Sequence, residues 1–178
     1  MGSLFAADKP PIGPDLVGAT GMIQRTFGPR SNAEGLLATG GAALAAHASF
    51  DPDYGRAQDW IRHHAVGPAV LSPILISGLT GALTEAAFPH GVITAHSMRH
   101  KRPLIVGVTV ASMIEVVSIK GVKELHSSEA DDDGSNRDHK RSKYGYDVVL
   151  RTVVTRVRDD AVIAEGTHEL WVPDYLRM

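Results

Sequence analysis

The segment GPAVLSPILISGLTGALTEAAF, residues 67–88, decides how this chain folds. Within it, Ser72 is a residue type that caps helices, and Pro73 suits the first helical position, where no backbone N–H is needed. The residues that follow are apolar on nearly every side, so the sequence predicts a helix that is buried. The segment is too short and too rich in glycine to predict a helix that spans a membrane.

The chain after this helix is predicted to form β-strands, over residues 92–100, 104–119, 144–158 and 161–173. The last of these has a period of two, which is typical of a strand with one buried face. Its predicted inner residues are Val162, Ala164, Gly166, His168, Leu170 and Val172. One buried helix followed by antiparallel strands predicts an α+β fold in which the sheet wraps around the helix.

The part of the chain before the helix is predicted to be less regular. From the N-terminus we expect a proline-rich lead-in, a strand, a helix and, after a turn, a short helix, over residues 1–15, 21–27, 31–46 and 51–64. Ser31 stands three residues before Glu34, which is the spacing of a capping box. Residues 120–143 are highly charged and predict a long solvated loop. We expect one domain over residues 1–178.

The composition excludes several classes of protein. The net charge of −2 leaves no electrostatic basis for binding nucleic acid or an anionic membrane surface. The absence of cysteine excludes disulfides, a thiolate nucleophile and a cysteine-based zinc site. The first ten residues lack the basic and apolar regions of a signal peptide, so we expect a cytoplasmic protein.

Four short stretches resemble the MaoC-like dehydratases and hydratases, which have the hot-dog fold. These are LVG at residues 16–18, LATGGAALAAH at 37–47, DPDYGRA at 51–57 and KRPLIVGVTV at 101–110. The resemblance implies an antiparallel sheet around a central helix. It also implies a homodimer, with a pocket for a small-molecule substrate at the subunit interface.

The chain departs from this family at the catalytic motif. Gly41 stands where the family has an Asp, and His47 matches the family's His only with one residue of slack. In the family, these two groups bracket a water at the β-carbon of an acyl thioester and add or remove it. Another acid, such as Asp51 or Asp53, would have to replace the missing carboxylate.

A second resemblance is to hot-dog thioesterases of the fluoroacetyl-CoA type. Ser72 stands where these have a Thr at a helix start, and His100 stands where they have a catalytic His, seven residues before Gly107. The sequence GTHE at residues 166–169 resembles their last strand. Their helix-borne Glu corresponds to Thr80. One catalytic group is therefore missing from this pattern too.

Chemistry on a thioester needs donors for its carbonyl oxygen and a group that moves a proton. Backbone N–H groups of residues 72–75 are predicted to supply the donors, although Ser72 and Pro73 would also be expected if they only start a helix. His96 and His100 stand an even number of positions apart in a predicted strand. Their side chains are therefore expected on the same face, where both can enter one pocket. The alternative for both is a half-exposed imidazole bonded to backbone, and His168 is interpreted as a core or interface residue.

The candidate site comprises eight residues. We expect the catalytic residues to be His100, His47, Ser72 and His96, and the substrate-binding residues to be Pro73, Ile74, Thr80 and Asp51. No third ligand accompanies His96 and His100, so we expect no metal. No glycine-rich stretch has the spacing of a nucleotide-binding loop, and we expect no cofactor.

Three functions follow, in order of preference. The first is an enzyme of a specialised tailoring pathway that acts on an acyl thioester or a polyketide-derived acid. Its reaction would be dehydration or hydration, or a related isomerisation or cyclisation by proton transfer. The second is hydrolysis of an acyl-CoA or acyl-carrier thioester. The third is a non-catalytic hot-dog subunit or ligand-binding protein.

Overall fold

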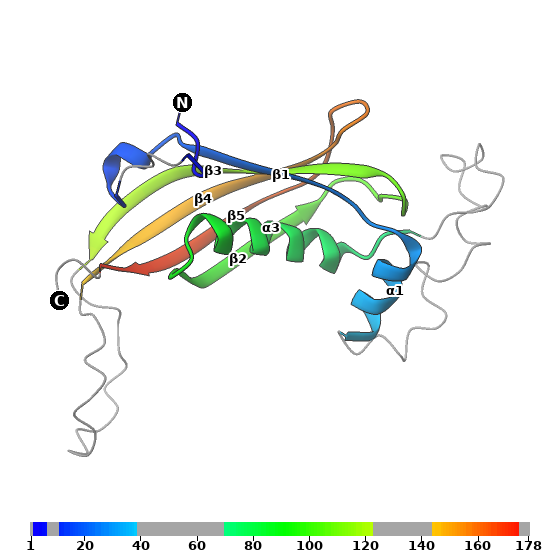
Figure 1. Cartoon of the computed structure of the whole chain (residues 1–178), viewed down its shortest axis with the longest axis horizontal. Helices are drawn as coiled ribbons and strands as arrows, with labels where there is room; N and C mark the ends of the chain where they lie inside the picture. Colours follow the sequence, from blue (N-terminus) through cyan, green and yellow to red (C-terminus); the bar gives the residue numbers. More distant parts are fainter. Residues whose placement is uncertain (1, 7–10, 39–69, 123–143, 175–178) are drawn as a thin grey trace, which may run out of the picture.

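The computed structural model describes residues 2–6, 11–38, 70–122 and 144–174. A five-stranded antiparallel sheet, in the order β1-β3-β4-β5-β2, curves around one long helix, α3 (Figure 1). The elements are η1 (Pro14–Leu16), β1 (Thr20–Thr26), α1 (Pro29–Ala38), α3 (Pro73–Ala87), β2 (Val92–His100), β3 (Thr109–Val122), β4 (Gly145–Arg156) and β5 (Ala161–Pro173). The predicted α+β fold, with a sheet wrapped around a helix, is confirmed.

Helix α3 begins where the sequence predicts. Ser72 occupies the N-cap and Pro73 the first helical position, although the Ser72 hydroxyl makes no capping hydrogen bond. One side of the helix packs most closely on β3 and β1 and is buried. The opposite side is exposed at Ile74, Gly78 and Ala82. The predicted burial therefore applies to one side of α3.

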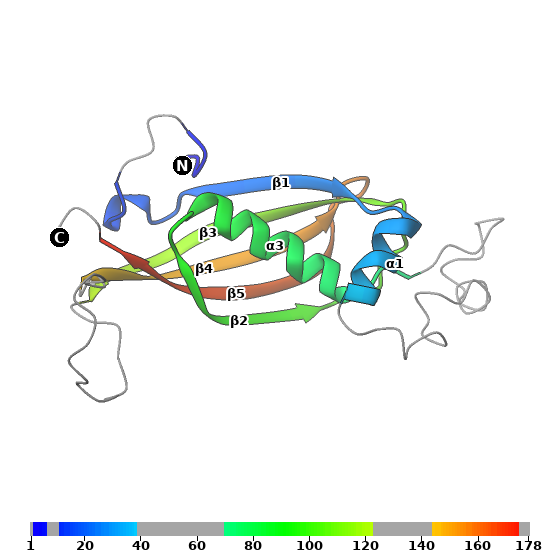
Figure 2. The ribbon, with the colours of Figure 1, turned by 60° about the horizontal axis from the view of Figure 1, so that its bottom comes forward.

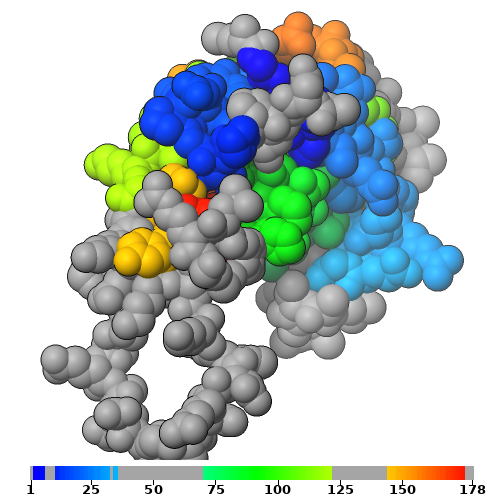
Figure 3. Space-filling view, turned by 60° about the vertical axis from the view of Figure 1, so that its left-hand side comes forward, coloured from blue at the N-terminus to red at the C-terminus, as the bar shows by residue number. Residues whose placement is uncertain are grey.

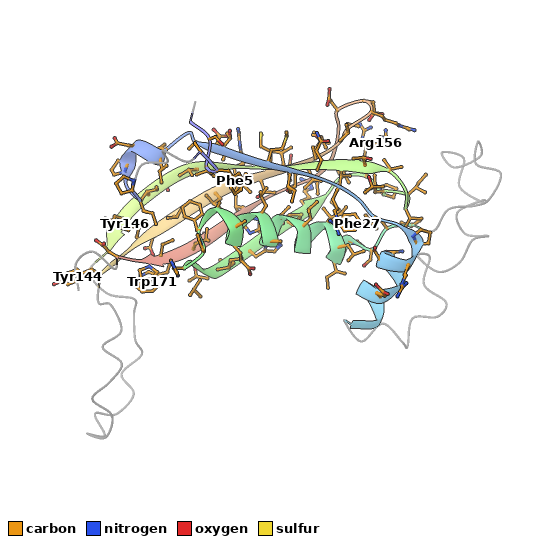
Figure 4. The ribbon with its side chains drawn as sticks, in the orientation of Figure 1. Phe5, Phe27, Tyr144, Tyr146, Arg156 and Trp171 are labelled. Atoms are coloured by element: carbon orange, nitrogen blue, oxygen red, sulfur yellow. The ribbon has the colours of Figure 1, made fainter. Side chains whose placement is uncertain are left out.

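A polar band divides the core into two apolar clusters. One cluster, centred on Ile114 and Leu150, packs Tyr146 against its edge, and the other, centred on Val110 and Val154, includes Phe27. Figure 4 shows Tyr146 and Phe27 toward opposite ends of the sheet. Four buried polar residues stand between members of the two clusters along their elements: Thr80 on α3, Ser112 on β3, Thr152 on β4 and His168 on β5.

Strands β2 and β5 have the predicted bounds, but β3 begins later than predicted. Residues 104–108 contain Gly107 at φ 85°, a backbone conformation that turns the chain, and Ile105 makes only an isolated bridge with Val70. The predicted inner face of β5 is wrong at Val162, which is exposed, whereas Ile163 is buried. The pairing of β4 with β5 shifts register at this point, and such a shift moves a strand's side chains to the other face.

The N-terminal part of the chain packs against the far end of α3. Leu4 and Leu16 are buried in one cluster with Phe88, and Ser3 pairs with Thr20. Figure 3 shows this segment in blue beside green atoms of the α3–β2 region. Within the described ranges, no helix is long and apolar enough to cross a membrane.

Helix α1 corrects the prediction of a capping box. The helix begins at Pro29, so Ser31 lies inside it, and Glu34 pairs instead with Arg30 at 2.7 Å. Residues 120–122 of the predicted loop belong instead to β3, which extends to Val122. Outside the described residues lie the rest of the predicted 31–46 helix, the predicted 51–64 helix and residues 123–143 of the predicted loop.

Candidate active site

The start of α3 and the end of β2 lie at the same end of the molecule. The chain runs along α3, reverses at Phe88 and Gly91, and returns along β2 (Figure 2). Leu71 and Ile76, which flank the helix start, share an apolar cluster with Ala164, the residue that pairs with His100. His100 therefore lies at the same end of the molecule as the amino end of α3.

The register of β2 against β5 places two of the predicted histidines on one face of the sheet. His96 pairs with His168 and His100 pairs with Ala164, and both partners are buried on the side that faces α3. Directly opposed residues of an antiparallel pair point to the same face. His96 and His100 thus face the helix side, and each remains exposed because α3 packs over the other half of the sheet.

His96 and His168 are in direct contact. Their Nδ1 atoms are 3.1 Å apart, and the rings meet edge to face with centroids 4.5 Å apart. His168 is completely buried, and this burial, together with repulsion from His96, lowers the pKa of His168 to about 4. His168 is therefore neutral at pH 7. The sequence predicts its burial but not its contact with His96, which depends on strand register.

His100 has properties that suit a base. Partial burial lowers the pKa of His100 below its usual value. The imidazole is therefore mostly neutral near pH 7, the form that accepts a proton.

The amino end of α3 offers fewer free donors than the sequence suggests. The Ser72 N–H donates to Asn32 Oδ1 at 2.8 Å, Pro73 has no N–H, and the Leu75 N–H donates to the Ser72 carbonyl at 3.1 Å. Ile74 is the remaining residue of this turn, and its N–H has no hydrogen bond to a described residue. The backbone donor that this turn offers a ligand is therefore the Ile74 N–H.

Asn32 fixes this turn and was not identified from the sequence. Its side chain is buried, accepts from Ser72 and donates from Nδ2 to the Val70 carbonyl at 3.1 Å. It stands 40 residues before Ser72 in the chain, so no local pattern signals the contact. Asn32 joins α1 to the segment that leads into α3.

The remaining predicted residues occupy different environments. Pro73 and Ile74 are exposed at the start of α3, whereas Thr80 is fully buried and donates its hydroxyl to the Ser77 carbonyl at 2.8 Å. His47 and Asp51 lie outside the described residues. In the part of the chain that the structure describes, no group of three or more histidine or carboxylate side chains is arranged to hold a metal ion.

Comparisons with known proteins identify the fold. No protein-family model and no curated protein matches the sequence. Among solved structures, an (R)-hydratase from A. caviae, involved in PHA biosynthesis, matches with a TM-score of 0.62 at 16% identity, over 88% of this chain and 96% of that one. The 3R-hydroxyacyl-ACP dehydratase complex HadBC from Mycobacterium tuberculosis matches with a TM-score of 0.58 at 15% identity, over 88% and 97%.

A thioesterase has the same architecture. A mutant of the fluoroacetyl-CoA-specific thioesterase FlK, in complex with fluoroacetate and CoA, matches with a TM-score of 0.50 at 17% identity, over 90% of this chain and 97% of that one. Hydratase, dehydratase and thioesterase thus share one arrangement of sheet and helix with this protein. The expected resemblance is confirmed at the level of architecture, and the chain has a hot-dog fold.

Proposed function

We propose that this protein is a hot-dog enzyme that acts on an acyl thioester or a polyketide-derived acid. The reaction is the loss or addition of water, or a related isomerisation or cyclisation by proton transfer, in a specialised tailoring pathway. The observation that supports this most is that His96, His100 and His168 share one face of the sheet, with His100 at the end of β2. Solved hydratases and dehydratases provide the same scaffold for thioester chemistry.

In this proposal, His100 is the base. Its neutral imidazole removes a proton from the carbon next to the thioester carbonyl. In dehydration, the resulting imidazolium gives this proton to the departing β-hydroxyl group, which leaves as water, and hydration follows the same steps in reverse. Negative charge develops on the carbonyl oxygen as the proton leaves the carbon, and the proposed donor to this oxygen is the His96 side chain or the Ile74 N–H. His47 and Asp51 remain predicted members of the same site.

A homodimer is part of the proposal. Strand β2 is at an edge of the sheet, and within the described ranges it pairs with β5 alone. An open edge offers backbone donors and acceptors to a second strand. Two copies paired through β2 would place His96 and His100 of each copy next to the other subunit.

Thioester hydrolysis is the second candidate. Gly41 removes the carboxylate that the MaoC-like pattern needs, whereas His100 suits either reaction. The match to the thioesterase FlK over 90% of this chain supports hydrolysis as the alternative. Release of free thiol distinguishes the two, because hydration leaves the thioester intact.

The test is an assay of purified protein with 2-enoyl, 3-hydroxyacyl and saturated acyl-CoA thioesters. Hydration is read from loss of the conjugated enoyl absorbance and hydrolysis from free thiol. His100→Ala is expected to lower kcat by about 10²–10⁴-fold, the contribution of a general base. Arg99→Ala changes the neighbouring residue, on the opposite face of β2, and is expected to retain activity.

Three other outcomes of this assay would each contradict part of the proposal. Equal activity of His100→Ala and the wild type would exclude His100 as the base. Thiol release without hydration would favour the thioesterase. No turnover of any thioester, together with co-purification of a second hot-dog chain, would favour a non-catalytic subunit.

A further inference from the structure

The contact between His96 and His168 joins an exposed imidazole to a buried one. His168 is fully buried on β5, whereas His96 is exposed on the edge strand β2. Their Nδ1 atoms are within hydrogen-bond distance, so one must donate and the other accept. The identity of the donor fixes the proton positions of both rings.

The surroundings of His168 identify the donor. Its other nitrogen, Nε2, is buried and has no hydrogen-bond partner among the described residues. A proton on Nε2 would be a buried donor without an acceptor, which is rarer in proteins than an acceptor that lacks a donor. The proton of neutral His168 therefore belongs on Nδ1, from where it donates to His96 Nδ1.

This assignment determines what His96 offers to a ligand. With Nδ1 accepting from His168, neutral His96 carries its proton on Nε2, on the side of the ring that points away from His168. A neutral imidazole N–H is a hydrogen-bond donor suited to an oxygen that gains negative charge. His96 thus differs in role from His100, whose neutral ring is proposed to accept a proton.

We infer that His168 is a positioning residue that holds His96 as an Nε2–H donor for the carbonyl oxygen of the substrate thioester. The ligand chemistry rests on the proposed function, whereas the proton positions rest on the geometry alone. Burial supports the assignment, because it lowers the pKa of His168 and keeps that ring neutral at the pH of the reaction.

The strands on either side hold the pair in place. On β4, Leu150 pairs with His168 and is itself fully buried. On the other side, Gly166 allows β2 to approach closely, since a Cβ atom there would lie 2.0 Å from the Ser97 carbonyl oxygen. The backbone that carries the two imidazoles therefore has little freedom to move. Such rigidity is needed to hold a hydrogen-bond donor in position.

The first experiment measures the proton positions. In protein labelled with ¹⁵N at histidine, long-range ¹⁵N–¹H correlation spectra at pH 7 distinguish Nδ1–H from Nε2–H rings. We expect His168 as the Nδ1–H form and His96 as the Nε2–H form. Addition of crotonyl-CoA as a probe is expected to shift the His96 Nε2–H signal. The opposite tautomers would overturn the inference.

The second experiment separates positioning from structure. His168→Leu fills the buried space without a donor, whereas His168→Asn keeps an amide N–H near the position of Nδ1. We expect His168→Leu to lower kcat about 10–100-fold with little change in KM, and His168→Asn to recover most of that loss. Equal losses in two folded variants would overturn the inference. If the wild type turns over no thioester, the proposed function fails and the tautomer spectra alone decide this contact.

Discussion

The two halves of the concave sheet face differ in what covers them. The β1 and β3 half lies under α3, and its inward residues Val110, Ile114 and Val116 are fully or almost fully buried. The β2 edge carries His96 and His100 on the same face, and both are exposed. One face of the sheet therefore supplies a packed core in its β1 and β3 half and exposed histidine side chains at its β2 edge.

This difference shows how a small domain accommodates both stability and chemistry. The free energy of apolar burial depends on the area removed from water, and among the strands α3 packs mainly on β3 and β1. Strand β5 connects the β2 edge to this core, because His168 on β5 is buried and contacts the exposed His96 on β2. Substitutions on the two halves should accordingly change different quantities.

The largest difference in stability is expected for two residues in the same row of the sheet. Ile114→Ala removes a fully buried side chain beneath α3 and should lower the free energy of unfolding by about 3–5 kcal/mol. Met98→Ala, on the half-buried β2 side, should lower it by about 1 kcal/mol. Urea denaturation measures both. Similar losses would mean that β2 is packed as tightly as β3.

Gly166→Ala tests the connection between the halves. The added Cβ would lie 2.0 Å from the Ser97 carbonyl oxygen, so β2 and β5 must separate locally. We expect a loss of about 3 kcal/mol in the free energy of unfolding and loss of the His96–His168 contact in histidine NMR spectra. An unchanged stability would show that β2 is free to shift and does not fix His96.

Acid should destabilise the fold through His168. Its folded pKa is about 4, below the ordinary value of 6.5, so between these values the unfolded chain binds a proton that the folded chain excludes. Stability therefore falls as the pH drops from 6.5 toward 4, by about 3 kcal/mol in total from this group. Denaturation of the wild type and His168→Asn at several pH values measures this. Identical pH dependence in both would contradict the burial of a neutral imidazole.

The sequence predicted most of the fold because its signals were local. Ser72 and Pro73 mark the start of α3, and the apolar alternation of residues 161–173 indicates β5. The late start of β3 follows from the turn at Gly107, whose positive φ is a property of the folded backbone. Likewise, the burial of Ile163 depends on a register shift between two strands, which neither strand encodes alone.

The candidate site was less predictable because its contacts are long-range. The alternation of His96 and His100 is local and gave their common face. The approach of His168 to His96 spans 72 residues, and that of Asn32 to Ser72 spans 40. Contacts between side chains so far apart in the sequence depend on strand register and on packing between helices. The sequence pattern therefore left the roles of these residues open.

The smallest expected effect concerns the outer side of α3. Gly78 is exposed in the middle of this helix, and a Cβ there would meet nothing within 4 Å. Because alanine restricts the unfolded chain more than glycine does, Gly78→Ala should raise the free energy of unfolding by about 0.5–1 kcal/mol. Urea denaturation, with sedimentation to follow the oligomeric state, measures the outcome. A destabilised protein, or a change in its association, would mean that another surface rests on this side of α3. In that case, the difference between the half of the sheet that α3 covers and the exposed β2 edge would describe the single chain and not its assembly.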